Sequence, residues 1–396
     1  MPTLRRTLAL TTAVAAMTAG ACGEEPGPLS DEPIVIGATQ SLTGAYATQG
    51  QAAYNGYRLC EAGLNEEGGL LGRPVEFIIH DDESDSERAM ALYDTLISET
   101  GVDAVLGPYG STLTEAVAPV TERYRMVHVS PLAATSSIWE QGREYLFMVL
   151  PPAELFLAGL IHMADDHGVE RIAVLAEDQL FPGAAAQGAA ELARERGMSV
   201  VLDSRYESGR EDFSAILEAM DEAGADVLAM AASNLDDFIT VTRQLKELDI
   251  TLKMFGTSGA VDEYIEALGA DGEFTYGLSA WEPTLPYPGI DSFVEAYEAQ
   301  FERRPSFHAA GAYGSCQLFA LAIEMAGSLD ADAIRHQLLN LETTTIFGPF
   351  AVDERGYQTA NQGVFIQWQD GDKVVVWPEE QATASPRIPT PAWDER

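Results

Sequence analysis

Positively charged residues are scarce in this chain. Only 23 of its 396 residues are Lys or Arg, against 62 Asp or Glu, so the formal net charge is −39. This excess of acid argues against binding to nucleic acid and to anionic membrane surfaces. A preference for cationic ligands is one interpretation. Because the acids are spread along the whole chain, we favour a generally acidic surface of the kind that high ionic strength screens.

Cysteine and histidine are also rare, with three and six copies. His80 is followed by three acids, but a strand end that runs into an acidic loop is a common turn device. His162 and His167 are five residues apart, so they do not share a helix face as a zinc-binding pair does. The chain also lacks the GxSxG, GxxxxGK[ST] and GxGxxG motifs. We therefore predict no enzyme, no metal site and no cofactor.

A membrane-spanning helix needs about 20 apolar residues, and the sequence has no apolar run of that length. The apolar stretch at 8–17 is short and follows two arginines, as in a cleavable signal peptide covering 1–21. Cys22 follows a small-residue stretch that resembles a bacterial lipobox, which predicts that Cys22 is acylated. An ordinary secretory signal cut nearby is the alternative. Residues 22–31, rich in Gly, Pro and Glu, are expected to form a tether.

The other two cysteines, Cys60 and Cys316, both lie in helix-like segments. An exported protein meets an oxidising environment, in which they can form a disulfide. They can equally be two small buried apolar side chains. The residues alone leave both alternatives open.

Short apolar strand patterns alternate with amphipathic helix patterns from Pro33 onward. This rhythm predicts the α/β class, with parallel, doubly wound sheets covered by helices on both faces. The segments 101–107 and 224–230 echo each other, since each is a strand that enters a small-residue turn and a helix. We therefore expect two similar lobes. The strand patterns fall at 34–38, 75–80, 102–106, 127–129, 171–175, 199–203, 226–230 and 255–257.

Loops rich in Gly, Ser and Thr follow three of the expected strands, at 43–50, 107–112 and 130–135. In a doubly wound sheet a ligand binds beyond the carboxyl ends of the strands. Hydroxyl groups and helix N-termini there favour a carboxylate or a carbonyl oxygen. Each loop alone is more simply a helix cap, but three together predict a binding site.

Several segments resemble the branched-chain amino acid and amide binding proteins of ABC importers, which are periplasmic binding proteins of type I. They are IVIGATQSLTGAYATQGQAAYNGYRL, GGLLGRPVEFIIHDDESD, VLGPYGSTLTEAVAP, VHVSPLAATS and PSFHAAGAY. The resemblance runs from 34 to 376. It implies two Rossmann-like lobes joined by a three-strand hinge, which close on a ligand and are then recognised by a membrane permease. We assign 32–150 and 281–342 to lobe 1, 151–280 and 343–377 to lobe 2, and 378–396 to a flexible tail.

The resemblance also implies ligand contacts in the first lobe. Ser111 would bind the ligand's carboxylate or carbonyl with the help of Gly110 and Thr112, and Ala133 and Thr135 would do so from the next loop. We expect Ser111→Ala to weaken ligand binding with little effect on stability, because one hydrogen bond is lost.

Further contacts are implied around the rest of the cleft. Phe181 falls near an aromatic position of the family that is normally Tyr, and Asn234 falls near another contact. Tyr46 and Gln49 are expected in the wall. Trp281 is either a wall residue or part of the packing of a lobe.

One position departs from the pattern of α-amino acid binders, which commonly carry an acid where this chain has Ser258. A buried ammonium without a counter-charge is costly, so this departure argues against an amino acid ligand. Asp178, Asp236 or Asp237 could replace the acid, although Asp236 and Asp237 could equally cap the following helix.

Taken together, these patterns predict a monomeric receptor that passes a small solute to an ABC permease. A branched-chain amino acid, an amide or a small carboxylate is the expected ligand. A sensor of the same fold that reports to a signalling partner is the alternative. No nucleic acid partner is expected, and membrane contact is expected only through the N-terminal lipid.

Overall fold

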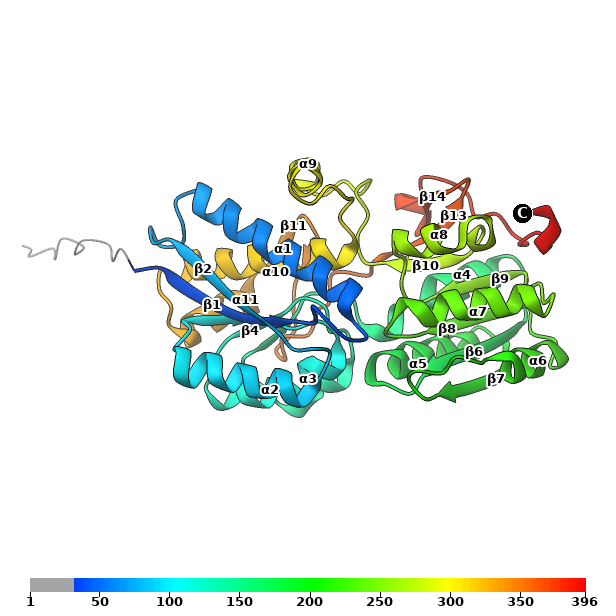
Figure 1. Cartoon of the computed structure of the whole chain (residues 1–396), viewed down its shortest axis with the longest axis horizontal. Coiled ribbons are helices and arrows are strands. Elements are labelled where there is room, and N and C mark those ends of the chain that lie inside the picture. The colour runs from blue at the N-terminus through cyan, green and yellow to red at the C-terminus, as the bar shows by residue number, and fades with distance from the viewer. Residues whose placement is uncertain (1–31) are drawn as a thin grey trace, which may run out of the picture.

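The computed structural model describes residues 32–396, which form two lobes side by side (Figure 1). Each lobe is built on its own mainly parallel sheet, as the alternation of strands and helices predicts. The expected signal peptide, Cys22 and the tether lie outside the described residues. The two-lobed α/β architecture inferred from the sequence is confirmed.

The first sheet has the strand order β2-β1-β3-β4-β5, and all of its pairings are parallel. Every residue of β3, β4 and β5 is buried, because helices cover both faces of the sheet. In Figure 1, α2 and α3 lie below this sheet and α1 and α10 above it. The strands are β1 Ile34–Gln40, β2 Val75–Asp81, β3 Ala104–Leu106, β4 His128–Ser130 and β5 Leu146–Met148. The helices are α1 Ala47–Glu66, α2 Ser86–Thr95, α3 Ser111–Arg123, α9 Ile290–Phe301, α10 Phe307–Ala326 and α11 Ala331–Asn340.

The second sheet has the order β14-β13-β10-β9-β8-β6-β7. Its strands up to β10 are parallel, and β13 and β14 add an antiparallel hairpin at one edge. The hairpin turns at Asp370 and Gly371, where the sequence predicts a turn. The strands are β6 Arg171–Glu177, β7 Ser199–Tyr206, β8 Val227–Ala231, β9 Met254–Thr257, β10 Tyr276–Ser279, β13 Val364–Gln369 and β14 Asp372–Trp377. The helices are α4 Ala158–Asp166, α5 Leu180–Glu195, α6 Ser214–Glu222, α7 Leu235–Glu247 and α8 Asp262–Leu268.

The chain passes between the two sheets three times, at 149–152, 280–289 and 351–363. Two of these passages are hydrogen-bonded side by side. The Met148 amide donates to the Gly356 carbonyl at 2.8 Å, and the Gln358 side-chain amide donates to the Val149 carbonyl at 3.2 Å. These passages form the hinge that the family resemblance implies.

The last passage begins later than we expected. We assigned 343 onward to the second lobe. However, β11 (Thr343–Thr345) and β12 (Gly348–Phe350) form a separate hairpin beside the first lobe. In the turn of this hairpin, the backbone amide of Ile346 donates a hydrogen bond to the side-chain oxygen of Gln317 on α10. This contact, and the packing of β11 on α10, place the hairpin with the first lobe.

The tail after Pro378 also differs from the loose segment that its composition suggests. Its Trp393 indole donates to the Ile250 carbonyl at 2.8 Å, and the Thr390 amide donates to the Lys253 carbonyl at 2.9 Å. Arg387 accepts from and donates to Gln367 on β13 through its backbone. The tail thus lies along the second lobe, because its Trp and its backbone find fixed partners there.

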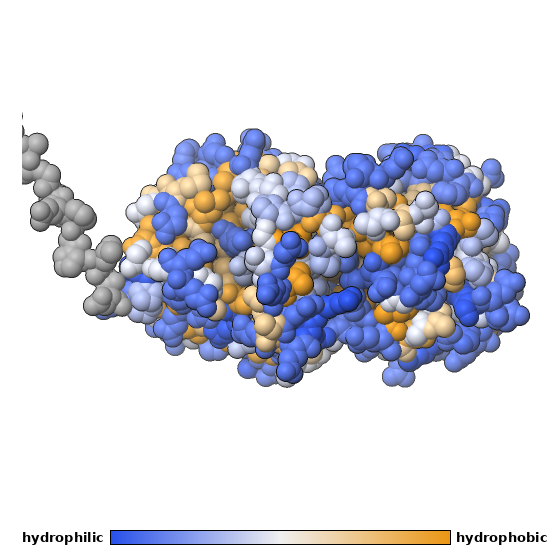
Figure 2. Space-filling view, turned by 90° about the horizontal axis from the view of Figure 1, so that it is seen from above, coloured by the Kyte–Doolittle hydropathy of each residue, from blue (hydrophilic) through white to orange (hydrophobic). Residues whose placement is uncertain are grey.

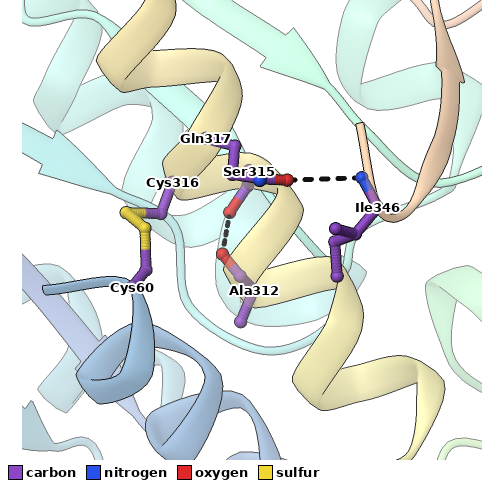
Figure 3. Close-up of a disulfide and its surroundings, with 6 residues drawn as sticks. All are labelled: Cys60, Ala312, Ser315, Cys316, Gln317 and Ile346. Atoms are coloured by element: carbon purple, nitrogen blue, oxygen red, sulfur yellow. Dashed lines mark hydrogen bonds between the residues drawn. A yellow bond between two sulfur atoms is a disulfide. The ribbon is translucent and has the colours of Figure 1, made fainter. Parts of the chain in front are cut away.

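A disulfide links α1 to α10. Cys60 and Cys316 are bonded across a sequence separation of 256 residues, which decides between the two alternatives left open above (Figure 3). The two helices approach closely because Gly56 has no side chain: a Cβ there would lie 2.2 Å from the Ala309 carbonyl oxygen. The bridge therefore fastens an early helix to one that arrives late in the chain.

The surface agrees with the acidic composition. In the view of Figure 2, hydrophilic residues dominate both lobes and apolar residues form small patches between them. No helix within residues 32–396 has the length and hydropathy to span a bilayer. No group of His, Cys, Asp and Glu side chains within the same residues is placed to hold a metal ion.

Candidate ligand-binding site

A cavity lies between the two lobes, where the carboxyl ends of the strands of both sheets face each other. Its volume is about 730 Å³, open solvent at its mouth included. The loops after β1, β3, β4, β6, β8 and β9 contribute to it, as expected for doubly wound sheets. The residues that line it are Tyr46, Gln49, Tyr109, Gly110, Ser111, Thr112, Leu113, Leu132, Leu150, Phe156, Phe181, Ala232, Ser233, Asn234, Leu235, Phe238, Ser258, Gly259, Val261, Phe307 and His308.

Asp81 and Asp82, which follow His80, hold a loop of this site. Asp82 is fully buried and accepts hydrogen bonds from Thr39 at 2.7 Å and from Ser41 at 2.6 Å. Burial raises the pKa of the Asp82 carboxyl, and those two hydrogen bonds oppose the shift. Asp81 accepts from the amide and hydroxyl of Thr43. Together the two carboxylates fasten the loop that leads from β1 into α1.

Helix α3 begins at the cavity wall. Gly110 precedes it with a φ of 80°, which a residue with a side chain rarely adopts. Because glycine has no side chain, the N-terminus of this helix has no side-chain cap. The first amide groups of a helix lack partners within the helix and carry partial positive charge. The amides of the first turn of α3 thus face a space in which a carboxylate oxygen would be stabilised.

Ser111 is 2% exposed and connects two loops of the site. Its hydroxyl oxygen accepts from the amides of Ala134 at 3.1 Å and Thr135 at 3.3 Å. Within residues 32–396 no acceptor takes the hydroxyl proton, so Ser111 can still donate to a ligand. Ala133 and Thr135 themselves do not line the cavity; Thr135 lines a neighbouring recess, and Leu132 is the part of this loop that reaches the ligand space.

Three rings form one wall. The ring centroid of Tyr109 lies 5.4 Å from that of Tyr46 and 5.5 Å from that of His308. Burial lowers the pKa of His308 to about 3, and the positive charge of Lys373 adds to the shift, so the imidazole is neutral near pH 7. Gln49 lies beside these rings, 6% exposed, and its Oε1 has no donor among the described residues.

The second lobe supplies the opposite wall. Phe181 packs edge-on against Phe156 with centroids 4.8 Å apart, and both line the cavity. Asn234 also lines it, but its side chain is the cap of α7, since it accepts from the Asp237 amide and donates to the Asp237 carboxylate, both at 3.0 Å. Ser258 lines the cavity beside Ala232, and its hydroxyl accepts from the Ala232 amide at 3.3 Å and donates to the Ala232 carbonyl at 3.4 Å.

Two buried acids lie behind this wall without lining the cavity. Glu177, which the sequence reasoning missed, accepts from the Ser233 amide at 2.8 Å and from the Ser208 hydroxyl at 2.5 Å. Asp237 accepts from the Tyr206 hydroxyl at 2.7 Å. Burial raises the pKa of the Asp237 carboxyl, although its hydrogen bonds oppose the shift. Of the other acids considered, Asp178 lines the neighbouring recess and Asp236 is exposed.

The lobes touch directly across the cavity. The Tyr109 hydroxyl of the first lobe donates to the Ser233 carbonyl of the second at 3.1 Å. The Thr112 hydroxyl donates to the Gln179 side chain at 3.3 Å. These bonds join loops of the two sheets, so the structure represents a closed arrangement.

Trp281 belongs to the packing of the first lobe and not to the site. It is 1% exposed, its indole donates to the Ile346 carbonyl at 2.8 Å, and its ring packs edge-on against Phe293. Of the residues expected at the site, all but Ala133, Thr135 and Trp281 line the cavity. Tyr109 was not among the expected contacts, although it stands in a strand-end loop. Phe307 and His308 were not expected either, because no local pattern connects them to the other loops.

Comparison with known proteins agrees with this geometry. A model of the family described as "Periplasmic binding protein" matches residues 33–373. A Leu/Ile/Val-binding protein homolog 8 of Brucella abortus is 27% identical, with 90% of this chain and 93% of the relative covered. A leucine-binding protein LivK from Thermotoga maritima superposes with a TM-score of 0.80 at 22% identity, covering 86% of this chain and 97% of the other. A solute-binding protein from Rhodopseudomonas palustris, in complex with 3,4-dihydroxy benzoic acid, gives 0.76 at 21%, covering 86% and 95%.

The fold and the cavity define a two-lobed protein that encloses a small molecule between strand-end loops. The family match extends over most of the described residues. The chain therefore belongs to the periplasmic binding protein family. Membership makes it a substrate-binding protein that works outside the cytoplasm.

Proposed function

We propose that the chain is the solute-binding subunit of an ABC importer, which captures a small organic solute between its lobes and presents it to a membrane permease. The observation that carries the proposal is the cavity enclosed by loops of both sheets and closed by the bond from Tyr109 to Ser233. Because that bond joins separate lobes, a ligand that contacts both walls favours closure by its differential affinity for the closed form.

The ligand class follows from the lining and from the relatives. A branched-chain amino acid, an amide or a small carboxylate fits a mostly apolar cavity with a few hydroxyl and amide groups. The Brucella relative is named for leucine, isoleucine and valine, the Thermotoga protein for leucine, and the Rhodopseudomonas protein contains an aromatic acid. These names support a small organic solute for this chain.

A thermal-shift screen tests the function. The purified protein is heated at high salt with amino acids, amides and small carboxylates, one compound at a time. A compound that binds the native state raises the melting temperature in proportion to the logarithm of its concentration. We expect at least one dose-dependent rise, whereas no shift from any compound of these classes contradicts the proposal.

We also propose that Cys22 carries the lipid anchor and that the protein is a monomer. The residues before Cys22 support the first point. Expressed in bacteria that process lipoproteins, the full chain should fractionate with membranes and incorporate labelled palmitate. Cys22→Ala should abolish the label, and label that persists in this variant contradicts the anchor. Sedimentation of the released domain should give the mass of one chain.

A further inference from the structure

The cavity lining carries no formal charge. Within residues 32–396, none of the side chains that line it belongs to Asp, Glu, Lys or Arg. His308, the one titratable base in the lining, is neutral near pH 7. A buried ammonium is costly unless it meets a counter-charge or a full set of acceptors. A ligand that brings an ammonium into this space would find no carboxylate in contact.

The two buried acids behind the wall, Glu177 and Asp237, are hydrogen-bonded to the protein itself. Both carboxylate oxygens of Glu177 accept hydrogen bonds, from Ser208 and from the Ser233 amide. Asp237 accepts from Tyr206 and Asn234. These bonds hold the loop after β8 in place. The acids therefore shape the wall of the second lobe from behind and do not line the cavity.

The first lobe offers that anion a place. The N-terminus of α3, which has 13 residues, opens on the cavity and lacks a side-chain cap at Gly110. Helices α5 and α10 also begin at the cavity without a side-chain cap, whereas α7 is capped by Asn234. What distinguishes α3 is the Ser111 hydroxyl in its first turn. The Ser111 hydroxyl lies in the same turn and can donate its proton to the ligand, because its oxygen accepts hydrogen bonds from two amides and no described residue accepts from it. Helix amides and a hydroxyl donor are the groups that stabilise a carboxylate without a cation.

Aromatic rings surround the remainder of the space. Tyr46, Tyr109 and His308 stand on the first lobe, and Phe156, Phe181 and Phe238 on the second. Flat rings favour an aromatic partner, which they contact by stacked or edge-on packing. The Gln49 oxygen, which is buried without a donor, can accept a hydrogen bond from a hydroxyl on such a ring.

We infer that the ligand is an aromatic monocarboxylate without an ammonium group. Its carboxylate lies at the N-terminus of α3 and Ser111, and its ring lies between the aromatic walls of the two lobes. This inference rests on the proposed function and narrows its ligand class. It excludes α-amino acids because the lining offers the ammonium no counter-charge.

Titration calorimetry with matched pairs tests the inference. 3-Phenylpropanoate is compared with L-phenylalanine, and 4-methylpentanoate with L-leucine, since the members of each pair differ only in the ammonium group. We expect 3-phenylpropanoate to bind at least about ten-fold more tightly than L-phenylalanine. Equal or tighter binding of either amino acid overturns the inference but leaves the proposed function standing. If 4-methylpentanoate binds and 3-phenylpropanoate does not, the aromatic part is wrong. If none of the four binds and the thermal-shift screen is silent, the proposed function itself fails.

A charge placed in the lining gives a second test. Ser258→Asp should weaken the binding of 3-phenylpropanoate about ten-fold or more and should create measurable affinity for L-phenylalanine. Ser258→Asn has nearly the same shape without the charge, so it should not gain L-phenylalanine. Both variants are first required to melt as single cooperative transitions. The inference is overturned if both variants gain affinity for L-phenylalanine. It is also overturned if neither gains it and Ser258→Asp keeps full affinity for 3-phenylpropanoate.

Discussion

The hydroxyl of Tyr109 in the first lobe donates a hydrogen bond to the carbonyl oxygen of Ser233 in the second, at 3.1 Å. The two residues stand in loops that follow β3 and β8, which are inner strands of separate sheets. Ser233 is held in turn by Glu177, which accepts from its amide. The bond can form only when the lobes are together, so it contributes to closure and not to the folding of either lobe.

Tyr109→Phe should therefore weaken ligand binding without loosening the fold. A neutral hydrogen bond contributes a net of about 0.5–1.5 kcal/mol, which corresponds to roughly a two- to twelve-fold loss of affinity. Calorimetry measures the affinity and thermal melting of the ligand-free protein measures stability. Tyr124→Phe is the matched control, because its hydroxyl bonds to Asp94 within the first lobe. Equal affinities for the two variants would contradict a role for Tyr109 in closure.

Ser111→Ala should lower both affinity and stability. From the sequence we expected only affinity to change, but the structure shows that the Ser111 oxygen accepts from the amides of Ala134 and Thr135. Leaving buried amides without an acceptor costs about 1–3 kcal/mol. Urea unfolding measures this loss. Ser315→Ala is the control, since that buried hydroxyl donates to the Ala312 carbonyl within its own helix and, among the described residues, accepts from no backbone amide. A stability loss no greater than in the control would refute the assignment.

Removal of the disulfide should destabilise the first lobe. The bond between Cys60 and Cys316 closes a loop of 256 residues, and bridges over long loops typically contribute about 2–5 kcal/mol. The double variant Cys60→Ala, Cys316→Ala should unfold at lower urea concentration than the parent. A reductant should lower the midpoint of the parent but not that of the double variant. Two titratable thiols in the native, unreduced parent would show that the bridge is absent.

Stability should fall as the pH drops below neutrality, in part through His128. Burial lowers the pKa of His128 to about 3, with a contribution from Arg143, whereas an unfolded histidine titrates near about 6.5. Between these values the unfolded chain binds a proton that the folded chain does not, so stability is full above about 6.5 and is lost toward lower pH.

Each such histidine contributes a slope of about 1.4 kcal/mol per pH unit. Urea unfolding between about pH 5 and pH 6 should therefore show a slope smaller by that amount in His128→Phe than in the parent. His80→Gln, which removes an exposed ring, controls for the loss of a histidine. Equal slopes in the parent and in His128→Phe would contradict a neutral, buried ring.

The strands of the two sheets were predictable because a parallel strand that is buried on both faces produces a short apolar run in the sequence. β6 and β8, for example, consist of seven and five residues that are almost all buried. The order of the tail was missed because it depends on one tertiary contact, that of Trp393 with Ile250.

The candidate site was predictable as far as it is made of strand-end loops. Ser111, Asn234 and Ser258 follow strands whose carboxyl ends meet at the same edges, so they come together by topology. His308 could not be placed in this way, because it enters from the start of α10, after the second crossing. The pairing of Cys60 with Cys316 likewise depends on which helices lie side by side.

Small-angle X-ray scattering tests the central claim that the lobes close on a solute. It is recorded on the purified protein alone and with a saturating amount of the compound that raises the melting temperature most. We expect a smaller radius of gyration with the compound, and a smaller decrease for Tyr109→Phe at the same concentration. An unchanged radius of gyration in the parent, at a saturation confirmed by calorimetry and from a ligand-free state that is not already closed, would contradict capture by closure.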